Sequence, residues 1–455
     1  MKLTTWRYLG LSAIMATLVA CSSDDNESTS NSSYIQYYNA SPNSTETALV
    51  LDDYAYSVVN FADSLPRYEY GTGTSELEIS GLDASGEELT LYQSSIEFAN
   101  TDNHLFMLVG DYGEPEVLDI VYRRSEMDEL NSDESGDYSK MQVLVAHAAM
   151  GESSFDAYLG KQGEEFSSAT MLGALNYKSY SNEQMFDTGD YVLYLTESGK
   201  TSPIFTTATL ELTANTVYKL VVRNSFGPGV PKLMVDNVDS TGSPEQYSNI
   251  DANAEYRLFN GLNKTNMVDA ELVSHQESQY LYELSQNQLT EFKAIGYNDY
   301  GVSISDSTTS EVLANNLLIT FNQDESKSIV LYEDELGGTK GMTITHDHRP
   351  RAFEHQISLA NLVADFDELT IYFVRSSETI ESAEYQISGI EFTELGSISL
   401  PSDDYEISVV YKDDNDTLTL VYQSDVVPFN QAGNYTMVLN RDDSQPLGYR
   451  LTTFQ

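Results

Sequence analysis

Cysteine and tryptophan are nearly absent from this chain of 455 residues, which contains one of each. Because Cys21 is the only cysteine, no disulfide can form within one molecule. The only tryptophan is Trp6, close to the N-terminus, so a carbohydrate-binding surface built on tryptophan rings is not expected in the rest of the chain. The 32 tyrosines suit strands and half-buried surfaces instead.

Basic residues are also scarce. The 23 Lys and Arg are outnumbered by 71 Asp and Glu, and the formal net charge is −48. Such a chain should repel nucleic acid and anionic membrane surfaces, so nucleic acid is not expected as a partner. We interpret the acidic excess as an aid to solubility, with divalent-cation binding as the alternative. No cofactor is predicted.

The N-terminal segment has the pattern of a secretion signal. Lys2 and Arg7 precede an apolar stretch, Leu9 to Leu18, that is too short to span a bilayer, and residues 1–20 are the predicted signal peptide. The stretch ends in Leu18-Val19-Ala20-Cys21, which resembles the lipobox of bacterial lipoproteins. The resemblance implies cleavage before Cys21, lipidation of its thiol and, with Ser22 next, sorting to the outer membrane of a Gram-negative bacterium. An ordinary secretion signal with a chance cysteine is the alternative.

The segment that follows contains no apolar side chain: residues 22–33 read SSDDNESTSNSS. It cannot bury a core, so residues 21–33 are predicted to be a lipidated, disordered tether. Fully extended, twelve residues reach at most roughly 40 Å, which would lift the first folded domain off the lipid surface.

Four related segments follow the tether. Each opens with an apolar strand that ends in one polar residue followed by small or turn-forming residues. These polar residues recur at intervals of about 100 residues, the length of an immunoglobulin-like domain. They are Asn39, His147, Asn260 and Asn361. The predicted domains are 34–128, 140–236, 253–345 and 353–455.

A second landmark recurs later in each segment. A turn is followed by a tyrosine that begins an alternating strand, at Tyr191, Tyr300 and Tyr405, while Gly71–Leu77 fills this place in the first segment without a tyrosine. Short alternating runs separated by Gly, Asn or Asp turns are typical of strands and hairpins, and no long segment has a helical period. The sequence therefore predicts an all-β fold: a tandem array of immunoglobulin-like β-sandwich domains.

The second segment resembles the bacterial domain of unknown function 4397. The residues that carry the resemblance are Val145–Ala149, Phe155–Leu159, Thr188–Tyr191 and the Ala214–Val222 hairpin, and Asn39-Ala40-Ser41-Pro42 echoes the family's opening in the first segment. Three segments have Asn where the family favours His, and the third and fourth match it only loosely. The resemblance implies a β-sandwich in the cell envelope, and the family supplies no activity.

The four repeated polar residues are interpreted as structural turn positions. Asn and His can both hydrogen-bond to backbone groups where a strand turns into a loop. A catalytic His could not be exchanged for Asn, because Asn does not titrate, and nothing pairs His147 with a nucleophile. No catalytic residue is predicted.

Two motifs carry candidate metal ligands. His346-Asp347-His348 with His355 is the only His cluster, but the neighbouring Arg349 and Arg351 disfavour a metal. Asp413-Asp414-Asn415-Asp416 clusters oxygens as a Ca²⁺ loop does, but lacks the Gly and distal Glu of an EF-hand. A linker and a turn explain them better, and no metal site is predicted.

Two glycine motifs are explained as turns. Ser198-Gly199-Lys200-Thr201 ends like a phosphate-binding loop, but Tyr194 stands where that loop needs its first glycine. Gly71-Thr72-Gly73 lacks the third glycine of a dinucleotide fingerprint, and no helix is predicted after it.

The sequence thus predicts a lipid-anchored envelope protein that is not an enzyme and acts as a binding or spacer module, at the cell surface or in the periplasm. The expected ligand is a glycan or another envelope protein, bound by loops at the sandwich ends. The alternative is an envelope hydrolase with a carboxylate site between domains.

Overall fold

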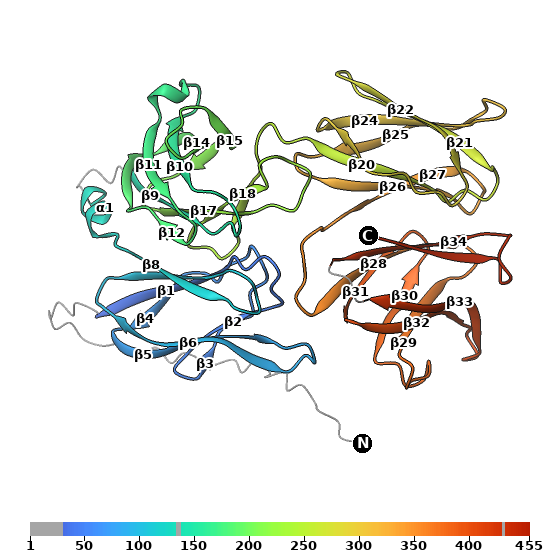
Figure 1. Ribbon diagram of the computed structural model, residues 1–455, viewed down its shortest axis with the longest axis horizontal. Helices are drawn as coiled ribbons and strands as arrows, with labels where there is room; N and C mark the ends of the chain where they lie inside the picture. The colour runs from blue at the N-terminus through green and yellow to red at the C-terminus, as the bar shows by residue number, and fades with distance from the viewer. Residues whose placement is uncertain (1–30, 133–137, 430–432) are drawn as a thin grey trace, which may run out of the picture. The chain divides into compact units, whose positions relative to one another are not determined.

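The described part of the chain is built almost entirely of β-strands. The computed structural model describes residues 31–132, 138–429 and 433–455 (Figure 1). The predicted signal peptide, Cys21 and most of the predicted tether lie outside these ranges. Two short helices occur within them, α1 (Ser125–Leu130) and the 3₁₀ turn Phe166–Ser168. None of the helices in these ranges is long and apolar enough to cross a membrane.

The strands form four β-sandwiches, which confirms the predicted all-β tandem array. The first contains β1 (Ser32–Asn39), β2 (Ala48–Leu51), β3 (Tyr54–Ala55), β4 (Tyr68–Gly71), β5 (Gly73–Leu82), β6 (Glu88–Phe98), β7 (Asn103–Val109) and β8 (Glu116–Tyr122). The second contains β9 (Lys140–His147), β10 (Phe155–Lys161), β11 (Thr170–Leu175), β12 (Ser179–Tyr180), β13 (Gln184–Asp187), β14 (Gly189–Glu197), β15 (Pro203–Thr206), β16 (Leu210–Leu212), β17 (Val217–Asn224), β18 (Leu233–Val238) and β19 (Glu245–Tyr247).

The third and fourth sandwiches contain eight strands each. The third has β20 (Ala254–Asn260), β21 (Met267–Val273), β22 (Ser278–Ser285), β23 (Lys293–Ile295), β24 (Asn298–Asp306), β25 (Val312–Phe321), β26 (Ser326–Glu333) and β27 (Thr339–Thr345). The fourth has β28 (Glu354–Leu362), β29 (Glu368–Val374), β30 (Tyr385–Glu391), β31 (Leu395–Pro401), β32 (Asp403–Lys412), β33 (Leu418–Phe429), β34 (Tyr435–Arg441) and β35 (Tyr449–Phe454).

All four sandwiches share one topology. Each has an antiparallel sheet and a mixed sheet, and the mixed sheet pairs the opening strand in parallel with the penultimate long strand. The mixed sheets run β4-β1-β7-β8, β12-β9-β17-β18-β19 (with β13 also on β9), β23-β20-β26-β27 and β31-β28-β34-β35. The antiparallel sheets run β3-β2-β5-β6, β11-β10-β14-β15 (with β16 also on β14), β22-β21-β24-β25 and β30-β29-β32-β33.

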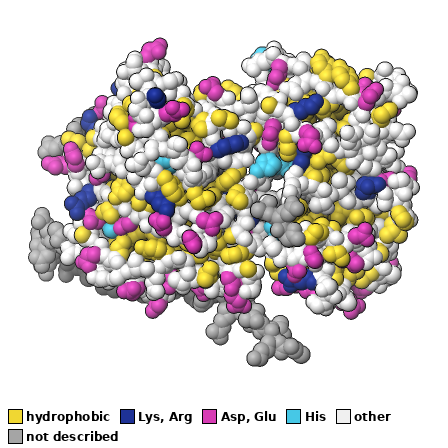
Figure 2. Space-filling view, in the orientation of Figure 1, with side chains coloured by type: hydrophobic (Ala, Val, Ile, Leu, Met, Phe, Trp, Pro, Cys, Tyr) yellow, Lys and Arg dark blue, Asp and Glu magenta, His cyan; other side chains and the backbone are white. Residues whose placement is uncertain are grey.

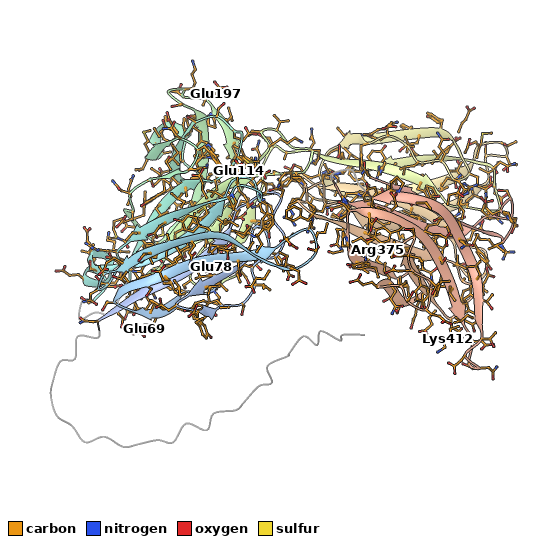
Figure 3. The ribbon with its side chains drawn as sticks, turned by 60° about the horizontal axis from the view of Figure 1, so that its bottom comes forward. Glu69, Glu78, Glu114, Glu197, Arg375 and Lys412 are labelled. Atoms are coloured by element: carbon orange, nitrogen blue, oxygen red, sulfur yellow. The ribbon has the colours of Figure 1, made fainter. Side chains whose placement is uncertain are left out.

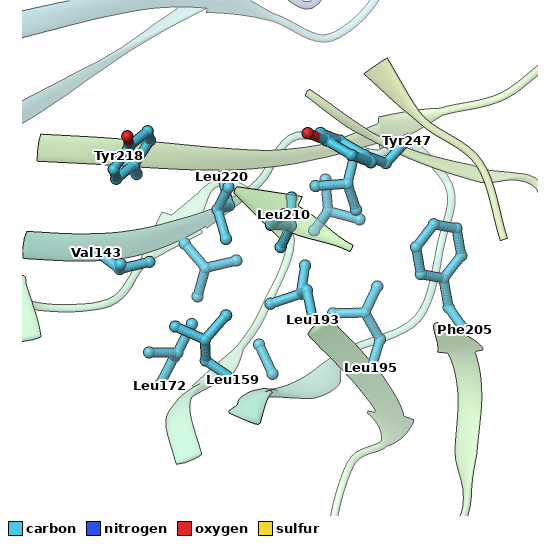
Figure 4. Packing of buried hydrophobic residues seen from close by; sticks show 14 of the residues in the cluster. Val143, Leu159, Leu172, Leu193, Leu195, Phe205, Leu210, Tyr218, Leu220 and Tyr247 are labelled. Atoms are coloured by element: carbon cyan, nitrogen blue, oxygen red, sulfur yellow. The ribbon is translucent and has the colours of Figure 1, made fainter. Parts of the chain in front are cut away.

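The core of each sandwich lies between its two sheets. In the second sandwich, Leu159 of β10 and Leu193 and Leu195 of β14 face Val143 of β9 and Leu220 of β17 (Figure 4). Alternate residues of these strands point inward because successive side chains of a strand lie on opposite faces. Separate clusters of the same kind fill the other three sandwiches.

The central strands of the mixed sheets are buried on both faces. Every residue of β7 is buried, and the last five of β1 are buried in succession. The reason is that the outer face of one mixed sheet packs against the outer face of the next. Tyr38, Leu105 and Met107 of the first sandwich meet Leu144 and Val221 of the second in one apolar cluster.

The third and fourth sandwiches pack in the same way. Phe259 and Val330 of the third sandwich share a cluster with Ala360, Leu362 and Val438 of the fourth. Residues Ser32–Gln455 therefore form one compact unit that contains all four sandwiches.

The recurring tyrosine at the start of an alternating strand has one structural role. Tyr191, Tyr300 and Tyr405 are buried, and their hydroxyls donate to the backbone carbonyl four residues earlier, at 2.8, 2.9 and 3.2 Å. Each bond closes the corner before the strand, as a tyrosine corner does in immunoglobulin-like domains. In the first sandwich the hydroxyl of Tyr70 lies 3.1 Å from Ser75 Oγ in the corresponding place.

Two predicted boundaries differ from the structure. Ser32 and Ser33, assigned to the tether, begin β1, because their backbone pairs with β4 and Ser33 Oγ donates to the Asp102 carbonyl at 2.8 Å. The predicted linker 237–252 contains β19, which pairs with β18 and extends the second sandwich to Tyr247. Both segments are polar in composition, but their backbone groups still form hydrogen bonds to neighbouring strands. Composition does not reveal this pairing, which explains both differences.

Candidate functional site

The four repeated polar residues have one geometry. Asn39, His147 and Asn260 each end the opening strand of their sandwich, Asn361 is the last residue but one of β28, and all four are fully buried. Each accepts a hydrogen bond from the backbone N–H two residues later: Ser41 to Asn39 and Val363 to Asn361 at 3.1 Å, Leu262 to Asn260 at 3.2 Å, and Ala149 to His147 Nδ1 at 3.3 Å.

The opposite end of each side chain reaches a backbone carbonyl. Asn260 and Asn361 donate through Nδ2 to the carbonyls of Leu284 and Ile390 at 3.0 Å, and His147 Nε2 lies 3.2 Å from the carbonyl of Ser153. Burial lowers the pKa of His147, so the ring is neutral at pH 7 and supplies one acceptor and one donor, as Asn does. These four side chains shape turns and leave no group free for catalysis.

The histidines of the cluster noted in the sequence form hydrogen bonds with neighbouring groups. His346 Nε2 lies 2.6 Å from Ser328 Oγ, and the nitrogens of His355 contact the Gly433 carbonyl at 2.8 Å and Ser402 Oγ at 2.9 Å. Burial lowers the pKa of His346 to about 3. Across residues 31–132, 138–429 and 433–455, no three His, Cys, Asp or Glu side chains are grouped to hold a metal ion.

The Asp413–Asp416 segment forms the turn between β32 and β33. Asp413 Oδ1 accepts the N–H groups of Asn415 and Thr417 at 2.9 and 2.8 Å. Asp416 pairs at 2.6 Å with Lys412, which Figure 3 labels. These carboxylates therefore hold the turn together through their hydrogen bonds and ion pair.

A hollow of about 870 Å³ is lined by residues of all four sandwiches. Three of its five carboxylates hold loops together. Asp324 accepts Gly229 N at 2.6 Å, Glu325 pairs with Lys327 at 2.8 Å, and Asp347 pairs with Arg351 at 3.3 Å. These contacts single out no acid–base pair of the kind that a hydrolase would need.

A smaller hollow of about 430 Å³ lies on the exposed face of the antiparallel sheet of the third sandwich. Two tyrosines of the edge strand β22 border it. Tyr280 is 48% exposed and Tyr282 is 70% exposed, and their rings lie parallel within 5° with centroids 6.1 Å apart. We call this surface, lined by Asp269, Glu271, Tyr280, Tyr282, Ser303, Ser305, Val312 and Asn315, the tyrosine face.

The two tyrosines are aligned by strand periodicity and by a β-bulge. Leu281, between them, points into the core, so Tyr280 and Tyr282 share the outer face. The bulge follows at Glu283, which has a φ of 55° and donates its N–H to Asp269 Oδ1 at 2.8 Å. Bulges commonly redirect side chains next to functional sites.

The polar groups of the tyrosine face are held in place by one another. Asp269 accepts Ser307 Oγ at 2.6 Å, and Ser303 Oγ donates to Asn315 Oδ1 at 2.9 Å. Glu271 hydrogen-bonds to the hydroxyl of Tyr280 and thereby raises the pKa of that phenol. The face therefore combines two exposed rings with oriented carboxylate, amide and hydroxyl groups.

The fourth sandwich lacks these rings at the same positions. Its strand β30 has the same bulge at Gly389, with a φ of 66°. Counting back from the bulge, Gln386 and Ser388 stand where the third sandwich has Tyr280 and Tyr282. The aromatic surface is thus absent from the fourth repeat and is not a requirement of the fold.

Sequence reasoning did not single out these tyrosines. The available signal was the alternation Tyr280-Leu281-Tyr282, which places two aromatic rings on one face of a strand. The sequence does not show whether that face is covered by a neighbouring sandwich, because the opening strands of the sandwiches also contain tyrosines, on faces that are covered.

No family model and no curated protein matches the chain. Solved structures similar to it include a DUF3823 family protein from Bacteroides ovatus, 12% identical over 39% of this chain and 100% of that chain, with a TM-score of 0.14. A family 26 carbohydrate-binding module of Eubacterium rectale Amy13K, solved with maltoheptaose, is 10% identical over 44% and 95%, with a TM-score of 0.15. A candidate cell adhesion protein from Bacteroides fragilis is 9% identical over 45% and 97%, with a TM-score of 0.13. These low values carry no information on function.

Proposed function

We propose that this chain is a non-enzymatic binding protein of the bacterial cell envelope and that the tyrosine face of its third sandwich binds glycan. The observation that carries the proposal is the pair of parallel, exposed rings of Tyr280 and Tyr282 beside fixed polar groups. Exposed aromatic rings on a monomer are costly to leave in water and are typical of binding surfaces.

The chemistry of the tyrosine face matches a sugar. A pyranose ring presents C–H groups that pack on an aromatic ring, and hydroxyl groups that need acceptors at its edge. Asp269 and Glu271 supply acceptors, and Asn315 supplies an amide. Two carboxylates at the site repel acidic sugars, so the expected ligand is a neutral glycan.

Replacing both tyrosines by their fourth-sandwich counterparts should abolish most of the binding. Each ring contact contributes about 0.5–1.5 kcal/mol, so Tyr280→Gln with Tyr282→Ser should weaken affinity about 10-fold or more. Affinity electrophoresis against dextran, starch, xylan, mannan and galactomannan measures this loss. The variant should unfold at the wild-type temperature, because both rings are exposed.

Two outcomes would contradict this proposal. Wild-type protein that binds none of the five polysaccharides would remove the glycan assignment. Release of reducing ends from a bound polysaccharide by the wild-type protein would instead favour the hydrolase alternative.

We further propose that Cys21 carries the lipid that holds the protein to the outer membrane. The Leu18–Cys21 pattern supports this proposal, as does the lack of any other cysteine. Cys21→Ala should move the protein from the membrane fraction to the soluble periplasmic fraction. Metabolic labelling with a radioactive fatty acid should mark wild-type protein and not the variant. Labelling of Cys21→Ala protein would place the lipid elsewhere.

A further inference from the structure

A second exposed group of aromatic rings lies on the first sandwich. The rings of Tyr54 and Tyr56 are 5.0 Å apart and nearly perpendicular, and those of Tyr56 and Tyr68 are 5.3 Å apart and inclined by 39°. Tyr54 is 65% exposed and Tyr68 is 38% exposed. We call Tyr54, Tyr56 and Tyr68 the tyrosine row.

The tyrosine row is held by a short hairpin. Strands β2 and β3 are joined by Asp52 and Asp53, and Leu51 pairs with Tyr54 across the turn. Asp52 Oδ1 accepts Glu76 N at 2.9 Å, and Asp52 Oδ2 accepts the hydroxyl of Tyr70 at 3.0 Å. These bonds fix the hairpin to β5 and β4, so Tyr54 projects from a rigid support.

The surroundings of the row are acidic. The hydrogen bonds to Glu76, Ser75 and Tyr70 lower the pKa of Asp52, so its carboxylate is charged at neutral pH. Asp53 lies beside it in the turn. Glu69, which Figure 3 labels, points to the opposite face of β4 and accepts the Ser32 hydroxyl, so it does not add to the charge at the row. Arg67 does not neutralise these groups, because its guanidinium lies over the ring of Tyr34 and donates to Asn103.

The row differs from the tyrosine face in the arrangement of its rings. Nearly perpendicular rings offer no flat platform for a pyranose. They instead present ring faces and hydroxyl oxygens next to carboxylates, and both carry negative electrostatic potential. Such a surface attracts a cation that can shed part of its hydration.

The chain uses the same chemistry for its own arginines. Arg67 lies 3.5 Å from the ring centre of Tyr34, and Arg257 lies 4.3 and 4.6 Å from those of Phe292 and Phe454. Guanidinium groups are therefore accommodated on aromatic faces inside this molecule. The row offers the same faces to solvent.

We propose that the tyrosine row is a binding site for a guanidinium or ammonium side chain presented by a basic partner protein. The net charge of −48 complements such a partner and would accelerate the encounter. The exposed rings, together with the Asp52 and Asp53 carboxylates, would then hold the cationic side chain. This site is separate from the tyrosine face and its ligand.

The test compares two pairs of tyrosine substitutions that leave the net charge unchanged. Calorimetric titration of the full chain with a tetra-arginine peptide should show binding that falls about 10-fold in Tyr54→Ala with Tyr68→Ala. The Tyr280→Gln with Tyr282→Ser variant is the matched control and should bind the peptide like wild type. A tetra-citrulline peptide, which keeps the shape without the charge, should not bind.

Two results would overturn the proposal. Equal affinity of wild-type and Tyr54→Ala, Tyr68→Ala protein for tetra-arginine would mean that only unspecific attraction to an acidic surface operates. Loss of polysaccharide binding in this variant, with peptide binding intact, would make the row a glycan surface. Neither result depends on whether the tyrosine face binds glycan, because that is measured with the other pair of substitutions.

Discussion

Arg223→Met should destabilise the packed first and second sandwiches by about 3–5 kcal/mol, because it leaves a buried carboxylate without its cation. Arg223 Nε lies 2.7 Å from Asp236 Oδ2, and the Tyr38 hydroxyl donates to the same oxygen at 2.5 Å across the interface. All three side chains are buried. Urea denaturation followed by circular dichroism measures the loss.

The effect of this substitution should depend on pH. Burial raises the pKa of Asp236, and Arg223 opposes the rise through its charge and its hydrogen bond. Without Arg223, the folded-state pKa lies further above the unfolded value. A carboxyl group whose pKa is higher in the folded state than in the unfolded state destabilises the fold at high pH. This destabilisation disappears at pH values below the pKa of the unfolded state. The deficit should therefore be largest at neutral pH and shrink as Asp236 becomes protonated.

A double substitution provides the control. Arg223→Met with Asp236→Leu removes both charges and should recover most of the stability, because a buried ion pair can be replaced by apolar residues at little cost. A double variant as unstable as the sum of the two single variants would mean that shape, rather than charge, explains the loss.

Phe259→Ala should weaken the packing of the third sandwich on the fourth by about 3–5 kcal/mol, the usual range for a buried phenylalanine. Phe259 is fully buried in the cluster between these sandwiches, while its neighbour Leu258 points into the core of the third. The variant should unfold at lower urea concentration. Proteases should also cut it faster in the linker 346–352.

Phe166→Ala tests whether this effect is specific to the interface. Phe166 is half-buried against Tyr158 and Tyr194 on the second sandwich, so its loss should leave cleavage in the linker 346–352 unchanged. Equal cleavage of both variants and of wild-type protein would contradict the proposed importance of the interface between the third and fourth sandwiches.

Local features of the fold could be predicted from the sequence because they repeat and depend on nearby residues. The strand ends at Asn39, His147, Asn260 and Asn361 are recognisable because each side chain bonds to backbone two residues away. The tyrosine corners at Tyr191, Tyr300 and Tyr405 are equally local, since each hydroxyl reaches a carbonyl four residues earlier.

The pairing of the sandwiches could not be predicted from these features. The sequence signal for this pairing was the unbroken apolar run in the opening strands, such as residues 143–146. A strand covered on one face alone would alternate apolar and polar residues. One network in the interface joins Tyr38 to Asp236, residues nearly 200 positions apart, and no local pattern reveals such a contact. The predicted domain bounds also left out β19, whose polar residues are used in backbone pairing.

The candidate sites consist of aromatic side chains that no neighbouring sheet covers. The sequence did not identify them because it does not show which side chains are covered. Tyr37 and Tyr38 occur in a strand, as Tyr280 and Tyr282 do, but the first two are fully buried and the last two are exposed. The residue type and the strand context are alike in both cases, and neither shows whether a ring is covered. Only the packing of whole sheets decides which rings meet solvent.

The parallel pairing of opening and penultimate strands has a consequence for biogenesis. In the first sandwich, Tyr34 lies beside Asn103, so about 70 residues must be synthesised before β1 meets β7. Until then an apolar strand remains unpaired and prone to aggregate, and this situation recurs in each of the four sandwiches. Efficient folding of this chain should therefore depend on holdase chaperones more than folding of a hairpin-built protein of equal length does.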